Sequence, residues 1–150
     1  MQMMGVNSAG VDVYYSTKGI GDKKHIKWFE EPEEQMAILA AMGKGKEDEM
    51  IAYSIEDVKK IPDVMPKMLA AWREGDMQKL SEVSLEEMQQ DYPEIYDQIL
   101  VQRNKNWVPK IERLFGDKHN EFILVGALHL AGDESVLSLL KEKGYSVEKY

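Results

Sequence analysis

The sequence predicts an α/β fold, and three features of the chain carry that prediction. An apolar segment, 121–125, has the pattern of a buried strand and precedes a glycine turn and a helical pattern over 134–143. An earlier β-prone segment, 25–30, likewise precedes a helical pattern that begins at Pro32. A last β-prone segment, 145–149, closes the chain. Strands that alternate with helices are typical of a sheet covered by helices.

In the N-terminal part we expect a short helix over 9–20, which Gly19 and Gly21 end. The segment 25–30 then forms a strand that stops at the Glu31–Pro32 step, because the residue before proline is held extended. Pro32 at a first helical position, followed by two glutamates, predicts a helix that runs to Gly43.

From 47 to 115 the pattern is almost entirely helical. We expect breaks at Gly75 and at each proline of this region, namely Pro62, Pro66, Pro93 and Pro109. Ser54 and Ser84 each precede an acidic residue by three positions, so both are candidate N-caps. Methionine and leucine stripes at helical spacing are read as core rather than as a binding surface.

The closing segment has the clearest local signals. Residues 122–125 suit a strand covered on both faces, and Gly126 allows a sharp turn after it. Asp133 is a good N-cap for the helix over 134–143, and Gly144 is a good C-terminal stop. The expected strand–helix–strand unit would have a right-handed crossover.

Length and composition indicate a single soluble domain, 1–150, with a helical subregion, 47–115. The chain has 150 residues, of which 43% are hydrophobic, and a formal net charge of −8. The charge argues against nonspecific binding of nucleic acid or of anionic lipid surfaces. The absence of cysteine excludes disulfides and thiolate metal sites. No apolar run approaches the ~18 residues that a membrane span needs.

His129 is the strongest candidate functional residue, because it follows the expected strand at the sheet edge where open α/β sheets bind ligands. A hydrogen-bonded structural histidine is the alternative. Glu30 ends the other strand–helix junction, where a carboxylate could bind metal or act as a general base. Its alternative is an acid that simply favours the start of the next helix.

Arg103, Asn104 and Trp107 form the remaining constellation. The arginine fork suits a carboxylate, and asparagine can both donate and accept hydrogen bonds. On a helix, Arg103 and Trp107 share one face, so the arginine could pair with Glu30 or a substrate carboxylate. Stacking of Arg103 on Trp107 is the alternative.

Several motifs, taken in order, resemble one known family. They are Gly10-Val11-Asp12, Phe29-Glu30 with Gln35, Ala71-Trp72-Arg73-Glu74-Gly75-Asp76, Arg103-Asn104 with Trp107, Gly126-Ala127-Leu128-His129, and Gly144-Tyr145-Ser146-Val147. Together they cover nearly the whole chain and resemble the TraB/GumN family, which includes bacterial pheromone-shutdown proteins and animal TIKI metalloproteases.

The resemblance implies a central mixed sheet of few strands with a large helical insertion, related to the erythromycin-esterase (EreA) and ChaN-like proteins. In the TIKI branch it also implies metal-dependent peptide cleavage by two GxxH motifs and a glutamate. Gly126 and His129 match the second GxxH, Glu30 the glutamate and Arg103 the family arginine. The first GxxH is not found in the chain, so we expect a C-terminal portion whose sheet is incomplete. An exposed sheet edge of that kind would invite a homodimer.

The resemblance therefore implies that the chain is part of a metal-dependent hydrolase acting on peptides and is inactive by itself. Glu30 and His129 would bind a divalent metal ion or activate water, and Arg103 with Asn104 would bind substrate. The alternative function is a non-catalytic module whose region 47–115 holds a peptide or small ligand, and a third is a structural domain in which His129 caps a turn. For the full-length protein, the resemblance implies an extracytoplasmic or membrane-associated location.

Overall fold

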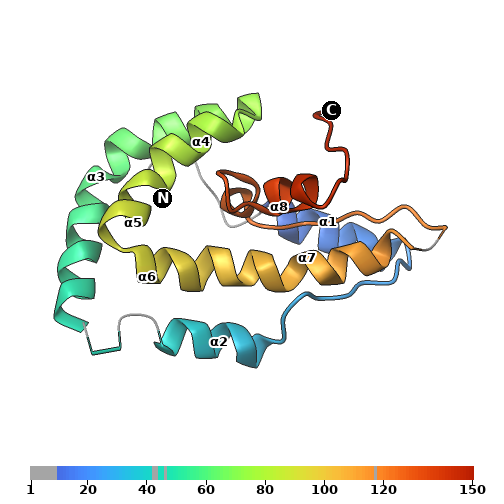
Figure 1. Ribbon diagram of the computed structural model, residues 1–150, viewed down its shortest axis with the longest axis horizontal. Helices are drawn as coiled ribbons and strands as arrows, with labels where there is room; N and C mark the ends of the chain where they lie inside the picture. The colour runs from blue at the N-terminus through green and yellow to red at the C-terminus, as the bar shows by residue number, and fades with distance from the viewer. Residues whose placement is uncertain (1–9, 42–43, 46, 117) are drawn as a thin grey trace. The chain divides into compact units, whose positions relative to one another are not determined.

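The computed structural model describes residues 10–41, 44–45, 47–116 and 118–150. The chain divides into two compact units, 1–31 and 32–150, and each is described by itself. Helices dominate both units, and no strand or sheet forms within the described ranges. The expected α/β fold with a central mixed sheet is therefore wrong, and the architecture is α-helical (Figure 1).

The smaller unit contains helix α1 (Val11–Gly21), close to the helix expected there. Gly19 lies inside the helix, and the chain leaves it through Lys23, whose φ is 54°. The side chain of Ile26 then folds back against Gly19, where a Cβ would lie 3.5 Å from Cδ1. The segment expected as the first strand, 25–30, forms no strand: residues 25–28 have no regular secondary structure, residues 29–30 form a bend, and Trp28 is 74% exposed.

The larger unit begins with α2 (Pro32–Ala41), which starts at the predicted proline. The 28-residue helix α3 (Glu47–Glu74) follows and contains Pro62 and Pro66, so the breaks predicted at these prolines are wrong. Each proline removes one backbone donor and bends a helix, and the remaining hydrogen bonds of a long helix preserve it. The ribbon of α3 curves accordingly (Figure 1).

The stop predicted at Gly75 is confirmed. Gly75 has a φ of 62°, and the Asp76 N–H donates to Ala71 O at 2.9 Å, which closes the left-handed cap that favours glycine. Asp76 then caps α4 (Met77–Ser84), because its Oδ1 accepts the Lys79 N–H at 2.9 Å. The same few residues thus end one helix and begin the next.

Neither serine predicted as an N-cap serves as one. Ser54 lies inside α3, where its hydroxyl donates to Met50 O at 2.8 Å. Ser84 is the last residue of α4, and α5 (Glu86–Asp91) begins after Leu85 without a side-chain cap. A serine hydroxyl inside a helix can donate to the carbonyl four residues back, so it can be hydrogen-bonded without capping the start of a helix.

A continuous helical segment runs from α6 (Pro93–Tyr96) through the π-helix η2 (Asp97–Val101) into α7 (Gln102–Leu114). Pro93 stands at its first turn, as predicted, whereas Pro109 lies inside α7, so that predicted break is wrong. The π turn is closed by the Gln102 N–H donating to Asp97 O. A π turn holds an extra residue and so changes which side chains of the following helix face inward.

The chain closes with the 3₁₀ helix η3 (Ala127–Leu130) and helix α8 (Val136–Glu142). Ser135 caps α8 by accepting the Ser138 N–H at 3.1 Å, so the cap predicted at Asp133 is wrong. The stop at Gly144 is confirmed, because its φ is 91° and the Tyr145 N–H donates back to Leu140 O at 3.1 Å.

The two other expected strands, 121–125 and 145–149, have no regular secondary structure, so these strand predictions are wrong. Phe122, expected between two covering layers, is 68% exposed. Side chains hold the C-terminal segment in place instead: the Tyr145 and Phe115 ring centroids lie 5.0 Å apart with the rings tilted by 59°, and Lys149 Nζ donates to Glu74 O at 2.5 Å. The sheet edge expected to support a homodimer thus has no counterpart among the described residues.

The main core lies where α3, α4, the π turn and η3 meet. α3 packs against α4, α7 packs against α8, and η3 contacts both α4 and α8. The buried residues of this core are Ala71, Leu80, Leu85, Tyr96, Leu100, Val101 and Ala131. Ala127 and Leu128 of η3 pack against the same core. Because η3 contacts both α4 and α8, these two helices hold the turn that carries His129.

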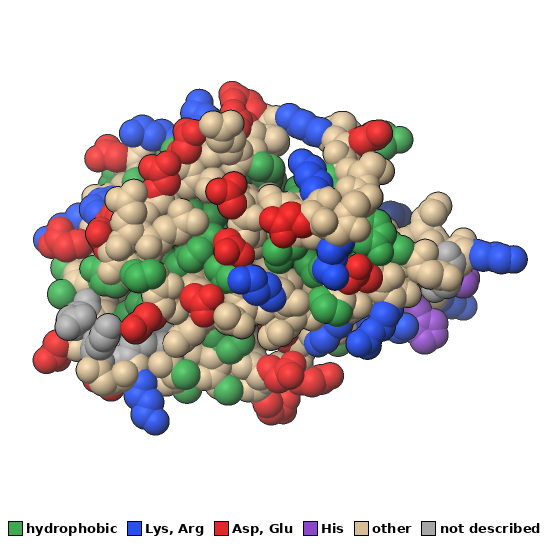
Figure 2. All heavy atoms as spheres, viewed as in Figure 1, with side chains coloured by type: hydrophobic (Ala, Val, Ile, Leu, Met, Phe, Trp, Pro, Cys, Tyr) green, Lys and Arg blue, Asp and Glu red, His purple; other side chains and the backbone are tan. Residues whose placement is uncertain are grey.

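Charged side chains of both signs are interspersed on the face shown in Figure 2, with apolar side chains between them. Of the helices described, none combines the length and the apolar character that a membrane crossing requires.

Candidate functional site

The turn that carries His129 begins at Gly126. The His129 N–H donates to Gly126 O at 2.9 Å and so closes the 3₁₀ turn. Gly126 has a φ of −57°, which any residue can adopt, but a Cβ there would lie 3.6 Å from His129 Cδ2. His129 is 7% exposed. The turn therefore buries the histidine instead of presenting it at a sheet edge.

The second part of the site is the N-terminal half of α7, directly after the π turn. Asn104 and Trp107 are three residues apart and are 2% and 5% exposed. Both face inward because residues three apart lie on one face of a helix. This face meets η3 and the turn that precedes α8.

A hydrogen bond joins the two parts of the site. His129 Nδ1 lies 2.6 Å from Asn104 Oδ1, and the Asn104 Nδ2 donates to Glu134 O at 2.8 Å. Next to this bond, Lys105 Nζ lies 3.4 Å from Glu134 Oε2. Asn104 thus ties α7 to both sides of the turn between η3 and α8.

Trp107 contacts both candidate residues. Its ring and the His129 ring have centroids 4.3 Å apart and an interplanar angle of 39°. The Arg103 guanidinium carbon lies 4.9 Å from a Trp107 ring centroid, and Nη1 donates to Ile99 O at 3.2 Å. The stacking that stood as the alternative for Arg103 is therefore present.

We call Arg103, Asn104, Trp107 and His129 the histidine cluster. The structure brings together three of the four predicted site residues, Arg103, Asn104 and His129, in the larger unit. Glu30, the fourth, belongs to the smaller unit, so its pairing with His129 stays a prediction.

The donor set for a metal ion is limited. Within the described ranges, no three His, Asp or Glu side chains gather closely enough to hold a metal ion. Zinc in catalytic sites usually has three protein ligands. His129 is chemically suited to be one of them, but the described residues bring no complete set together.

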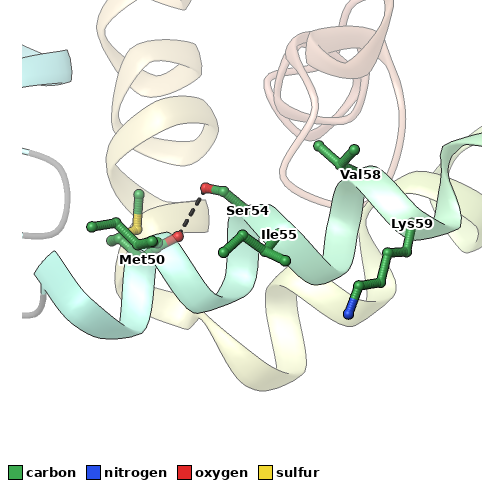
Figure 3. A pocket seen from close by; sticks show the side chains of 6 residues that line it. Met50, Ser54, Ile55, Val58 and Lys59 are labelled. Atoms are coloured by element: carbon green, nitrogen blue, oxygen red, sulfur yellow. Dashed lines mark hydrogen bonds between the residues drawn. The ribbon is translucent and has the colours of Figure 1, made fainter.

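A separate surface feature lies on the N-terminal half of α3. It is an open apolar groove with a volume of about 520 Å³, and Figure 3 shows lining side chains on successive turns of the helix. Its lining consists of Met50, Ile51, Ser54, Ile55, Val58 and Lys59. We call it the α3 groove. Ile51, Ile55 and Val58 recur at helical spacing and are 60%, 53% and 62% exposed.

Sequence reasoning missed the α3 groove and the part played by Glu134. The spacing of Ile51, Ile55 and Val58 was readable, but such a stripe is normally taken as core. Glu134 acts through its backbone carbonyl, which every residue has, so no side-chain pattern could indicate it.

The family assignment rests on comparison with known proteins. The model of the TraB/PrgY/gumN family matches residues 1–149. No curated protein and no solved structure matches the chain significantly. A match over this length, together with the ordered motifs, leads to one conclusion: the chain belongs to the TraB/PrgY/gumN family.

Proposed function

We propose that this chain carries part of the site of a metal-dependent hydrolase that acts on peptides, with His129 as an imidazole ligand. The observation that supports the proposal is the hydrogen bond between His129 Nδ1 and Asn104 Oδ1, 2.6 Å long and buried. Histidines that bind metals commonly use one ring nitrogen for the metal and hold the other in a fixed hydrogen bond. The histidine cluster has that arrangement.

The remaining roles follow from the chemistry of each side chain. A divalent metal ion, once bound, would supply the acidity that makes water a nucleophile at neutral pH. Glu30 would act as a second ligand or accept the proton of that water. Arg103 would orient a substrate carboxylate, and its guanidinium is already held over Trp107 at 4.9 Å.

The test uses the protein expressed from its complete coding sequence. We expect it to bind a divalent metal ion and the His129→Ala variant to lose that binding. His119→Ala is the matched control, because His119 is exposed and lies outside the histidine cluster. Metal stoichiometry that is unchanged in His129→Ala would contradict the proposal.

A second candidate function is a non-catalytic module that retains a peptide. The α3 groove favours it, because an open apolar surface on a helix suits the apolar side chains of a peptide. The net charge of −8 favours a peptide that also carries basic residues. We therefore take an apolar, basic peptide as the occupant.

Product analysis separates the two candidates. An apolar, basic probe peptide incubated with protein and metal would be recovered intact but retained if the chain only binds, and cleaved if it is a hydrolase. Ile55→Asp should abolish retention, whereas Leu39→Asp, at an exposed apolar position on α2, should preserve it. Equal retention by both variants would exclude the α3 groove as the binding surface.

A further inference from the structure

We propose that Asn104 is a positioning residue that holds the neutral His129 ring in the Nδ1–H tautomer. The ring nitrogen with the lone pair would then be Nε2. Both nitrogens of imidazole can carry the proton, so the one that serves as ligand or base depends on the hydrogen bonds around the ring. The inference concerns the tautomer, and only its use toward a metal or substrate rests on the proposed function.

The first step is the orientation of the Asn104 amide. Glu134 O is a carbonyl oxygen, which accepts but never donates, and it lies 2.8 Å from Asn104 Nδ2. The NH₂ group must therefore face Glu134. The flipped amide would place two carbonyl oxygens against each other in a site where Asn104 is 2% exposed.

The second step follows from the first. With Nδ2 directed to Glu134, Oδ1 faces His129 Nδ1 at 2.6 Å. An amide oxygen only accepts, so the imidazole nitrogen must donate. In the neutral ring this places the proton on Nδ1 and the lone pair on Nε2.

Packing and a backbone hydrogen bond fix the orientation of the imidazole ring. Trp107 contacts one side of the imidazole with centroids 4.3 Å apart. The backbone of His129 is fixed by its bond to Gly126 O. A flip of the ring about its Cβ–Cγ bond would move Nδ1 away from Asn104 and break a buried hydrogen bond. Asn104 Oδ1 would then be a buried acceptor without a donor, which raises the free energy of the folded state.

The geometry adds a role to the one expected of Asn104. The sequence suggested that this side chain binds substrate, but both ends of its amide are engaged within the protein. Asn104 thus acts on His129, and the substrate contact expected of it stays a prediction.

The experiment is nitrogen-15 NMR of the imidazole rings in the chain as it exists. It is recorded near pH 8.5, about two units above the ordinary histidine pKa of about 6.5. The chain has three histidines, and His129→Gln identifies the signals of this ring. An unprotonated ring nitrogen resonates far from a protonated one, so the spectrum reports the tautomer directly.

We expect the Nδ1–H form to exceed the other by about fivefold, the ratio that one hydrogen bond of ordinary net strength sustains. In Asn104→Ala that preference should be lost. Asn104→Asp keeps an acceptor beside Nδ1 and should retain it. Asn106→Ala is the matched control, because Asn106 is an exposed asparagine on the same helix.

Three results would overturn the inference: an Nε2–H ring in the native chain, an unchanged tautomer in Asn104→Ala, or an Nε2–H ring in Asn104→Asp. The native spectrum and Asn104→Asp decide the matter if the alanine variant does not fold. Metal binding is measured separately, so its failure would count against the proposed function and would leave the tautomer assignment standing.

Discussion

Gly132 lies directly against Ser81, and this contact seats the turn after η3 on helix α4. A Cβ built on Gly132 would lie 3.0 Å from the Ser81 hydroxyl oxygen and 3.7 Å from Leu85 Cδ1. Gly132 also has a φ of 82°, a conformation that side chains disfavour. Glycine at position 132 thus serves both the positive φ of the backbone and the close contact with Ser81.

Gly132→Ala should therefore destabilise the fold more than Gly144→Ala. Both variants force alanine into the left-handed region at about 1–2 kcal/mol. In Gly132→Ala the new Cβ also crowds Ser81, which adds about 1 kcal/mol. A Cβ at Gly144 would have nothing within 4 Å, so Gly144→Ala carries no such cost. Urea unfolding measures the difference. Ser81→Ala in the Gly132→Ala background removes the hydroxyl and should abolish the extra loss of unfolding free energy relative to Gly144→Ala. If that extra loss persists, the contact with Ser81 is not its cause.

Asn104→Ala should lower the free energy of unfolding by about 1–3 kcal/mol, because the partly buried Glu134 carbonyl and the buried His129 would lose their partner. Asn106→Ala, on the exposed side of α7, should change it by less than about 0.5 kcal/mol. Denaturant titration of both variants gives the comparison. Equal losses would show that the buried amide contributes nothing beyond helix formation.

Core and groove positions should respond differently to the same kind of truncation. Leu85→Ala, at a residue 1% exposed, should cost about 2–5 kcal/mol because it leaves a cavity. Ile55→Ala in the α3 groove should cost less than about 0.5 kcal/mol, since this side chain is 53% exposed. Thermal unfolding at matched concentrations tests the pair. A large loss in Ile55→Ala would show that the groove is covered in solution.

Alkaline pH should weaken the fold partly through Tyr96. Burial raises the pKa of the Tyr96 phenol above its usual value of 10.0, and the carboxylates of Glu134 and Asp133 raise it further. The folded state thus holds this proton more tightly than the unfolded state does. Its contribution is fully present below pH 10 and is lost as the pH rises through the folded-state pKa.

The measurement is the free energy of unfolding as a function of pH above 9 in the native chain and in Tyr96→Phe. With rising pH the native chain should lose unfolding free energy more steeply than Tyr96→Phe does. Below pH 9 the two slopes should coincide. Parallel curves throughout would show that Tyr96 titrates alike in both states.

Elements specified by local chemistry were predictable from the sequence. Pro32 begins α2, Gly75 ends α3 and Gly144 ends α8, as expected, because a fixed φ or a tolerance of positive φ acts within a few residues. The prolines inside α3 and α7 were misread, since a long helix with tertiary contacts retains its other hydrogen bonds around each proline.

The expected strands failed for a different reason. An apolar extended segment becomes a strand only when another segment supplies the partner hydrogen bonds, and that pairing is nonlocal. Segments 121–126 and 145–150 have no regular secondary structure, and no strand occurs in the described part of the chain. Composition alone therefore could not show whether these segments join a sheet.

The sequence by itself determined the family, the helical region, the helix ends set by proline and glycine, and the interest of Arg103, Asn104 and His129. Only the tertiary structure decided that Asn104 bonds to His129 and that Trp107 contacts both the histidine and the arginine. The physical reason is separation along the chain. Residues 104 and 129 meet through the packing of η3 and α7 around buried apolar side chains, and no local pattern encodes that contact.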